Sequence, residues 1–195
     1  MKYSDIYRLY STSQPKDAIH QALREVPVDD SDEQYEDRSP LHLACQYGDT
    51  EGVKILLERD AEPNTKDANG STPIHILGRT SAGCADEDKL KEIAVMLIEQ
   101  GANIPRSAKN TTALIECVRN RHFKMAEAII NSGARVNSTD LNGENVLFGF
   151  CAASGDIRRN IRFAKKELDE AVQYRYPENK IEEIRSRIAR LEDDG

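Results

Sequence analysis

The sequence lacks any hydrophobic run long enough to cross a membrane. Its longest uncharged apolar stretch is Val146–Ala153, far short of the roughly 18–20 residues that a bilayer helix requires. The first 16 residues also lack the apolar segment of a secretory signal, because Lys2, Asp5 and Arg8 fall within them. These two absences lead us to expect a soluble cytoplasmic protein with no membrane partner.

Basic residues are also in deficit. The 195 residues include 27 Lys and Arg against 34 Asp and Glu, which gives a formal net charge of −7. Phosphate binding depends on neutralisation by Lys and Arg, so this balance argues against nucleic acid as the main partner. Residues 155–195 are neutral overall, with 10 basic and 10 acidic side chains, which places the whole excess on the first 154 positions.

The sharpest concentration of negative charge is a run of six acids within nine positions. Its members are Asp29, Asp30, Asp32, Glu33, Glu36 and Asp37. Such a run is either a solvated loop or a charged surface that attracts a basic partner. Both interpretations stay open at the level of the sequence.

Motifs for metal binding and catalysis are missing as well. The four cysteines, Cys45, Cys84, Cys117 and Cys151, form no CxxC pair, so neither a zinc site nor a dithiol is indicated. No HExxH, GxSxG, P-loop or GxGxxG pattern occurs. We therefore expect no enzyme, no cofactor and no metal. A redox role for Cys84 is conceivable, but no basic neighbour lowers its pKa, which favours incidental placement.

What the sequence does contain is an internal repeat. One set of matching segments comprises Ser39-Pro40-Leu41-His42, Thr72-Pro73-Ile74-His75, Thr112-Ala113-Leu114-Ile115 and Asn145-Val146-Leu147-Phe148. A second set comprises Leu56-Leu57, Leu97-Ile98 and Ile129-Ile130, followed by the stops Asp60-Ala61, Gly101-Ala102 and Gly133-Ala134. Both sets recur with a spacing near 33 residues, apart from an insertion near 80–88.

The period and the Thr-Pro-Leu-His type of signature resemble the ankyrin repeat, in particular small bacterial-type ankyrin repeat proteins. The resemblance implies an all-α helical solenoid of stacked helix-turn-helix units with β-turn connectors. The predicted units are a degenerate N-terminal capping repeat (1–33), repeat one (34–66), repeat two with the insertion (67–106), repeat three (107–139), a divergent repeat four with a long second helix (140–176) and a C-terminal helix (177–195). In repeat one, Asp37 stands where glycine is usual.

Apolar stripes outside the repeats predict further helices. Tyr3, Ile6, Tyr7 and Tyr10 form one stripe, and Ala18, Ile19, Ala22 and Leu23 form the next. The last helix carries Ile181, Ile184, Ile188 and Leu191 at 3–4–3 spacing. This seam either caps the solenoid within the chain or joins two chains, and we expect a monomer.

The resemblance also bears on function. It implies that His42 and His75 tie adjacent repeats by hydrogen bonds to connector backbone, which we favour over a catalytic or metal-binding role. It implies a non-catalytic protein-binding module whose partner contacts connector tips and first-helix ends. The corresponding residues are Tyr35, Glu36, Arg38, Gln46, Tyr47, Asn69, Ser71, Arg79, Thr80, Lys109, Thr111, Arg119, Asn120 and Glu144. The net charge favours a partner with a basic surface, and an alternative is an acidic inhibitor that blocks a basic enzyme active site.

Overall fold

The computed structural model describes residues 2–80, 86–104, 112–134 and 157–193. The chain divides into two compact units, Met1–Ser132 and Gly133–Gly195. The structure of each unit follows from its own sequence pattern, and the two units are described in turn.

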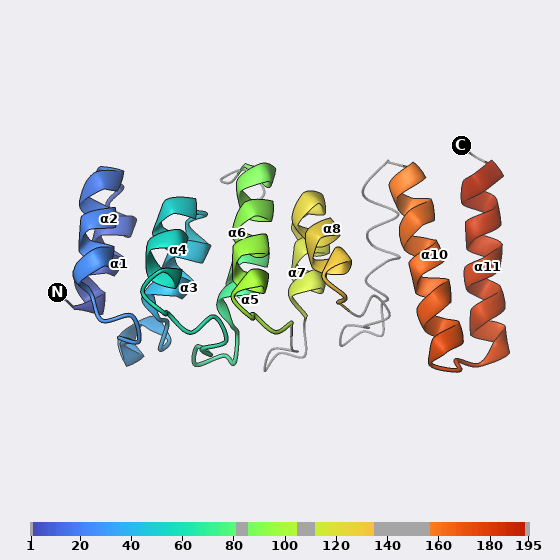
Figure 1. The fold of residues 1–195 in the computed structure, drawn as a ribbon, viewed down its shortest axis with the longest axis horizontal. Coiled ribbons are helices and arrows are strands. Elements are labelled where there is room, and N and C mark those ends of the chain that lie inside the picture. Colours follow the sequence, from blue (N-terminus) through green and yellow to red (C-terminus); the bar gives the residue numbers. More distant parts are fainter. Residues whose placement is uncertain (1, 81–85, 105–111, 135–156, 194–195) are drawn as a thin grey trace. The chain divides into compact units, whose positions relative to one another are not determined.

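The first unit is a row of helix pairs. In chain order its helices are α1 (Tyr3–Ser11), α2 (Lys16–Glu25), the 3-10 helix η1 (Glu33–Tyr35), α3 (Pro40–Gln46), α4 (Thr50–Leu57), α5 (Pro73–Gly78), α6 (Glu87–Glu99), α7 (Ala113–Arg119) and α8 (Phe123–Asn131). Figure 1 shows the pairs side by side, with the connectors from α2 to α3 and from α4 to α5 along the lower edge in that view. The all-α fold predicted from the repeats is confirmed.

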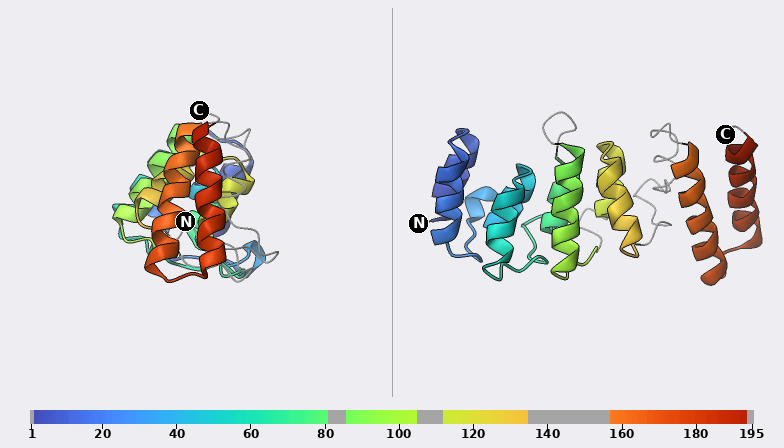
Figure 2. Two further views of the ribbon diagram at one scale, coloured as in Figure 1. Left: turned by 90° about the vertical axis from the view of Figure 1, so that its right-hand side faces the viewer. Right: turned by 45° about the horizontal axis from the view of Figure 1, so that its top comes forward.

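The helices of the first unit form two layers. The first helices of the pairs pack on one another, α1 on α3, α3 on α5 and α5 on α7. The second helices do the same, α2 on α4, α4 on α6 and α6 on α8, and the right-hand view of Figure 2 shows them in a row. Because each pair buries its apolar side chains against its neighbours, the pairs stabilise one another as in a solenoid.

The first helices begin at the first of the repeated sequence motifs. Ser39 and Thr72 are the N-cap residues of α3 and α5, with Pro40 and Pro73 in the first turn. Proline is tolerated there because its missing N–H would have had no partner inside the helix. Thr112 caps α7 in the same way, and its Oγ1 accepts a hydrogen bond from the Ile115 N–H at 3.2 Å.

The residues that end the second helices adopt left-handed backbone. Gly101 and Gly133 have φ of 85° and 97°, and Asp60 at the equivalent position has φ of 62°. A Cβ atom added to either glycine would meet nothing within 4 Å. Backbone conformation alone therefore selects glycine there, and Asp60 accepts a conformation that L-residues disfavour.

Both helices of the N-terminal pair contribute buried side chains to the core. Tyr3, Ile6 and Tyr10 of α1 are buried, as are Ile19, Ala22 and Leu23 of α2. Two members of the predicted stripes depart from it, because Ala18 is exposed and Tyr7 is only half-buried. The outward position of Tyr7 is the more consequential difference, since it leaves an aromatic ring at the surface.

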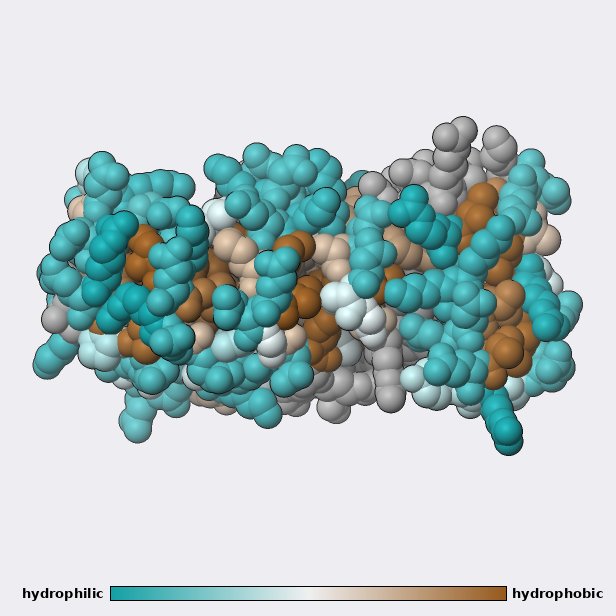
Figure 3. Space-filling view, in the orientation of Figure 1, coloured by the Kyte–Doolittle hydropathy of each residue, from teal (hydrophilic) through white to brown (hydrophobic). Residues whose placement is uncertain are grey.

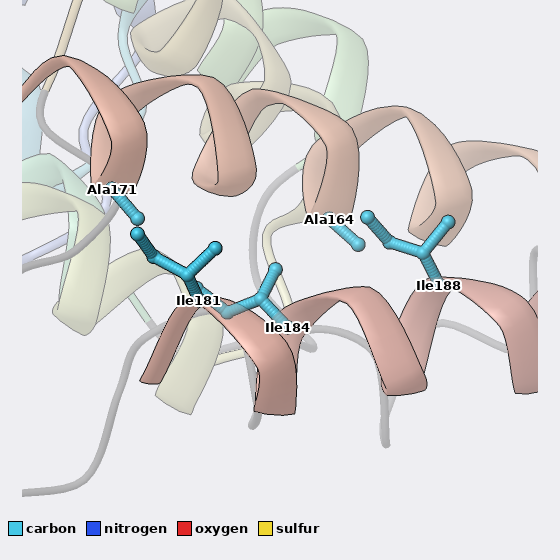
Figure 4. Packing of buried hydrophobic residues seen from close by; sticks show 5 residues of the cluster. All are labelled: Ala164, Ala171, Ile181, Ile184 and Ile188. Carbon is cyan, nitrogen blue, oxygen red and sulfur yellow. The ribbon is translucent and has the colours of Figure 1, made fainter. Parts of the chain in front are cut away.

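The second unit contains α10 (Ile157–Gln173) and α11 (Glu178–Asp193) as a pair of packed helices. Ile181, Ile184 and Ile188 of α11 point at Ala164 and Ala171 of α10, as Figure 4 shows. Figure 3 shows the corresponding strip of apolar side chains between the two helices, with hydrophilic side chains on both sides.

The isoleucine seam predicted for the last helix is thus occupied within the chain, and Leu191 packs against the same cluster. Its role as a cap of the repeats stays a prediction. Residues 140–156 of the predicted repeat four lie outside the described residues, as do residues 81–85 of the predicted insertion.

Candidate functional site

The first connector (residues 26–39) and the second connector (residues 58–72) are joined at their tips. The Ala68 N–H donates to the Glu36 carbonyl at 2.8 Å. The Arg38 guanidinium donates to Gln46 Oε1 at 2.8 Å and to Glu36 Oε2 at 2.5 Å. Its Nε lies 3.7 Å from Asp67 Oδ2. Three predicted binding residues, Glu36, Arg38 and Gln46, therefore form one connected group.

The tip of the second connector is a closed turn built on Asp67. Its Oδ1 accepts the N–H groups of Asn69 at 2.9 Å and Ser71 at 2.8 Å. The Asp67 N–H in turn donates to the Ser71 carbonyl at 2.9 Å, and Gly70 has φ of 68°. This arrangement, typical of an aspartate-initiated turn, fixes the backbone of Asn69 at the tip.

His42 is completely buried and makes the tie predicted for it. Its Nε2–H donates to the Ser71 carbonyl at 3.0 Å, which links α3 to the second connector. Its Nδ1 accepts from the Ser39 N–H at 3.1 Å and from the Ser39 hydroxyl at 2.9 Å. Because one ring nitrogen donates and the other accepts, the ring must be neutral. Burial accordingly lowers the pKa of His42 to about 4, against the opposing effect of the Ser71 hydrogen bond.

His75 repeats the same local geometry one unit later. Its Nδ1 lies 3.3 Å from the Thr72 N and 2.8 Å from the Thr72 hydroxyl, and the ring is fully buried. Neither histidine is open to a substrate. In repeat three Ile115 occupies this slot, so no histidine ring can make the tie there.

Two predicted binding residues prove to be internal, which corrects their assignment to a contact surface. Ser71 is fully buried and its hydroxyl accepts from Arg79 Nη1 at 2.9 Å. Thr80 is also buried and its carbonyl accepts from His122 Nε2 at 2.6 Å. Both lie at positions that the repeat pattern places near the surface, but stacking of the next pair covers them.

The ends of the first helices hold the remaining predicted residues of this layer. Arg79 forms an ion pair with Glu116, with Nε and Oε1 3.1 Å apart. Asn120 donates from Nδ2 to the carbonyls of Gly78 at 3.0 Å and Glu116 at 2.9 Å. Arg119 is exposed beside it. These side chains join neighbouring helices of the layer while remaining partly accessible.

Two of the predicted binding residues, Tyr35 and Tyr47, lie against tyrosines of α1. The ring of Tyr47 stacks on Tyr10, with centroids 4.9 Å apart and planes 11° apart, and remains 40% exposed. Tyr35 contacts Tyr7 at 4.2 Å and Tyr3 at 5.7 Å. The N-terminal pair therefore contributes to the candidate site, which the repeat pattern alone did not indicate.

The acidic run lies on the first connector, and its members have different roles. The Asp30 carboxylate accepts the Tyr3 N–H at 2.9 Å, and Asp32 accepts the Gln34 N–H at 2.9 Å. Asp29 and Glu33 are exposed and form no ion pair with any residue that the structure describes. These two acids are therefore the most available to act on a partner.

Sequence reasoning missed a buried polar cluster under Tyr47. Asp49 accepts a hydrogen bond from the Tyr10 hydroxyl at 2.8 Å, and His20 Nε2 lies 3.0 Å from both of its oxygens. A Cβ at Gly52 would come within 2.6 Å of Asp49 Oδ2, so glycine leaves room for the carboxylate. The partners are 29 and 39 residues apart, a distance at which no local pattern signals contact.

Several predicted features cannot be placed. Lys109, Thr111, Glu144 and Cys84 lie outside the described residues. Cys45 and Cys117 are buried, and burial raises the pKa of both thiols, which disfavours the reactive thiolate.

Within residues 2–80, 86–104, 112–134 and 157–193, no group of three His, Cys, Asp or Glu side chains could hold a metal ion. The helices of that same part of the chain include none long and apolar enough to span a bilayer.

Known proteins share this pattern. A family model described as "Ankyrin repeats (many copies)" matches residues 22–77, and one described as "Ankyrin repeat" matches residues 109–141. The chain is 38% identical over 69 residues to the transient receptor potential cation channel subfamily A member 1 homolog of Caenorhabditis elegans, which covers 35% of this chain and 6% of that protein. It is 31% identical over 133 residues to the human neurogenic locus notch homolog protein 1, covering 68% of this chain and 5% of that protein. The chain thus spans only a small fraction of the length of these curated relatives.

Proposed function

This chain is an ankyrin repeat protein, and on that premise we propose that it is a non-catalytic module that binds another protein through its connector tips and first-helix ends. Ankyrin repeats are protein–protein interaction modules. The proposed surface comprises Tyr35, Glu36, Arg38, Gln46, Tyr47, Asn69, Arg79, Arg119 and Asn120. We also propose that Lys109, Thr111 and Glu144 belong to this surface. A cytoplasmic location and a monomeric state are further parts of the proposal.

The observation that carries this proposal is the fixed geometry of the two connector tips. Arg38 joins Glu36 to Gln46, and Asp67 holds the backbone of Asn69. A surface that is ordered before binding loses less conformational entropy when a partner arrives. Such preorganisation suits recognition of a folded or extended protein segment rather than chemistry on a small molecule.

We further propose that the partner presents a basic surface. Asp29 and Glu33 project from the first connector, at the rim of this face, without a described ion-pair partner. Charges at a rim act mainly on association, over a distance of about 8 Å at physiological salt. An acidic inhibitor of a basic enzyme would be one form of this arrangement.

The site is tested by adding bulk at the connector tip. Asn69→Arg places a long side chain where the backbone is held but the side chain has no described hydrogen bond. The partner is first captured from native lysate with the wild-type chain and identified by mass spectrometry. Its affinity for the variant should be at least about tenfold lower than for wild type. The control Glu51→Arg, on an exposed position of α4 in the other layer, should bind as wild type. Equal binding by Asn69→Arg would rule out the connector tips as the contact surface.

The charge is tested separately with Asp29→Asn/Glu33→Gln, which spares Asp30 and Asp32 because they hold backbone N–H groups. The association rate with the captured partner should fall as salt rises for wild type, and the variant should flatten this dependence. Glu51→Gln/Glu58→Gln changes the net charge equally on the other layer and should leave the dependence intact. An on-rate insensitive to salt would identify the acidic run as a solvated loop.

A further inference from the structure

Five of the seven tyrosines fall within the first 47 residues, and the fold brings their rings together. Tyr35 contacts both Tyr3 and Tyr7, and Tyr47 stacks on Tyr10. Tyr7 and Tyr10 are three residues apart on α1, so they lie on one side of that helix and bring the two ring pairs next to each other. We call the accessible members, Tyr7, Tyr35 and Tyr47, the tyrosine patch.

The rings of the patch present faces rather than a closed cage. The Tyr10 and Tyr47 planes are 11° apart, so one face of Tyr47 is covered by Tyr10 while the side chain stays 40% exposed. Tyr7 and Tyr35 are tilted by only 32°. A compact ammonium group is best enclosed by rings at steep angles, whereas a planar guanidinium stacks on an open ring face.

Several carboxylates lie on the connector that carries Tyr35. Asp30 holds the Tyr3 N–H, Glu33 lies in the same 3-10 turn as Tyr35, and Glu36 follows directly after it. The chain's own Arg38 is engaged by Glu36 and Gln46. Glu33 therefore remains available, together with Asp29, to pair with a cation that arrives from outside.

The buried side of the patch contains an unsatisfied donor. The Tyr3 side chain is 1% exposed, and its hydroxyl has no hydrogen-bond partner among the described residues. Burial raises the pKa of this hydroxyl, with smaller effects from Arg38, Tyr7, Asp32 and Tyr35, which places it beside the patch. Because this hydroxyl is inaccessible, it belongs to the packing behind the patch and offers no contact to a bound segment.

We propose that the tyrosine patch binds an arginine side chain of the partner protein. The guanidinium would stack on the open faces of Tyr47 and Tyr7, and Glu33 and Asp29 would supply the opposite charge. This inference rests on the proposed function and specifies its partner as a segment containing arginine. Lysine fits less well because its ammonium is strongly hydrated and cannot stack on a flat ring.

The test is selection of random linear peptides displayed on phage against the full chain. We expect enrichment of peptides with arginine, and replacement of that arginine by lysine or by uncharged, planar citrulline should weaken binding about tenfold. Tyr47→Leu and Tyr7→Leu should weaken the arginine peptide by a similar factor. Tyr174→Leu, at a 52% exposed tyrosine of the second unit, is the matched control and should have no effect.

Ring signals of isotope-labelled tyrosine provide a second measurement, because seven residues give a simple spectrum. The arginine peptide should shift Tyr7, Tyr35 and Tyr47 and leave Tyr174 and Tyr176 unchanged. Selected peptides that lack arginine, or that bind Tyr47→Leu as well as wild type, would overturn the proposal. If such peptides are nevertheless lost on Asn69→Arg, the connector surface stands and only the arginine site fails.

Discussion

Between α3 and the second connector, a buried polar tie adds to the apolar packing of the helices, whereas between α10 and α11 contact is made mainly through methyl groups. In the first unit His42 spans from its own helix to the Ser71 carbonyl. In the second, Ile181, Ile184 and Ile188 pack on Ala164 and Ala171. Hydrogen bonds have fixed donors and acceptors, so the first kind of contact specifies one register, while the second derives its stability from buried area. The second unit adds specificity through an ion pair of Arg187 with the buried Glu167.

Of the two kinds of contact, the apolar seam between α10 and α11 should show the larger loss of stability when one side chain is shortened. Ile184 is 1% exposed, and Ile184→Ala should lower the free energy of unfolding of the α10–α11 pair by about 3–4 kcal/mol, from lost burial and a residual cavity. Hydrogen exchange of amides in α10 and α11 measures this. Val172→Ala, at a 53% exposed position of α10, should change stability by less than about 0.5 kcal/mol. A small effect of Ile184→Ala would show that the seam does not stabilise the pair.

Removal of a polar tie comes next. His42→Ala leaves the buried Ser39 N–H without its partner and removes one of the two donors to the Ser71 carbonyl, the other being the Asp67 N–H, which should cost about 2 kcal/mol of stability. Urea denaturation followed by circular dichroism measures the loss. Ser39→Ala removes only one of the bonds to the ring and should cost about 1 kcal/mol. A His42→Ala variant as stable as wild type would contradict the structural role of the ring.

The polar tie also makes the first unit sensitive to acid, unlike a seam of methyl groups. The folded-state pKa of His42, about 4, lies below the ordinary value of 6.5. Its contribution is therefore fully present above pH 6.5 and is lost as pH falls toward 4, by about 2 kcal/mol between pH 7 and pH 5. Urea denaturation at the two pH values should show this loss for wild type and a smaller one for His42→Ala. Equal losses in both proteins would assign the acid sensitivity to other groups.

These outcomes bear on how far the sequence determines the fold and the site. The helix starts at Ser39 and Thr72, the stop at Asp60 and the tie of His42 follow from residues close together in a repeating pattern. The burial of Ser71 and the pairing of Asp49 with Tyr10 do not, because they depend on how closely successive pairs stack. The tyrosine patch does not follow from the sequence either, because Tyr7 belongs to a helix with no repeat signature.

The smallest change in stability is expected from substitutions at residues with left-handed backbone, and it should be similar in the two units. Asp60 follows α4 with φ of 62°, and Arg175 lies between α10 and α11 with φ of 53°. Asp60→Gly and Arg175→Gly should each raise stability by about 0.5–1 kcal/mol, because glycine relieves the left-handed strain at some cost in unfolded-state entropy. Melting temperature measures both changes. Asp60→Ala and Arg175→Ala keep a Cβ and should bring no gain, and a gain with alanine would refute the explanation.

The hydrogen bonds that Arg59 makes to the preceding helix pair bear on how the protein folds during translation. It donates to the carbonyls of Leu23 and Val26, residues that end α2, from the end of the following pair. His20 with Asp49, and Asn64 with Asn103, likewise join residues 29 and 39 positions apart. Each pair therefore receives its last hydrogen bonds only after the next pair has left the ribosome. The nascent chain should acquire protease resistance in steps that lag one repeat behind translation.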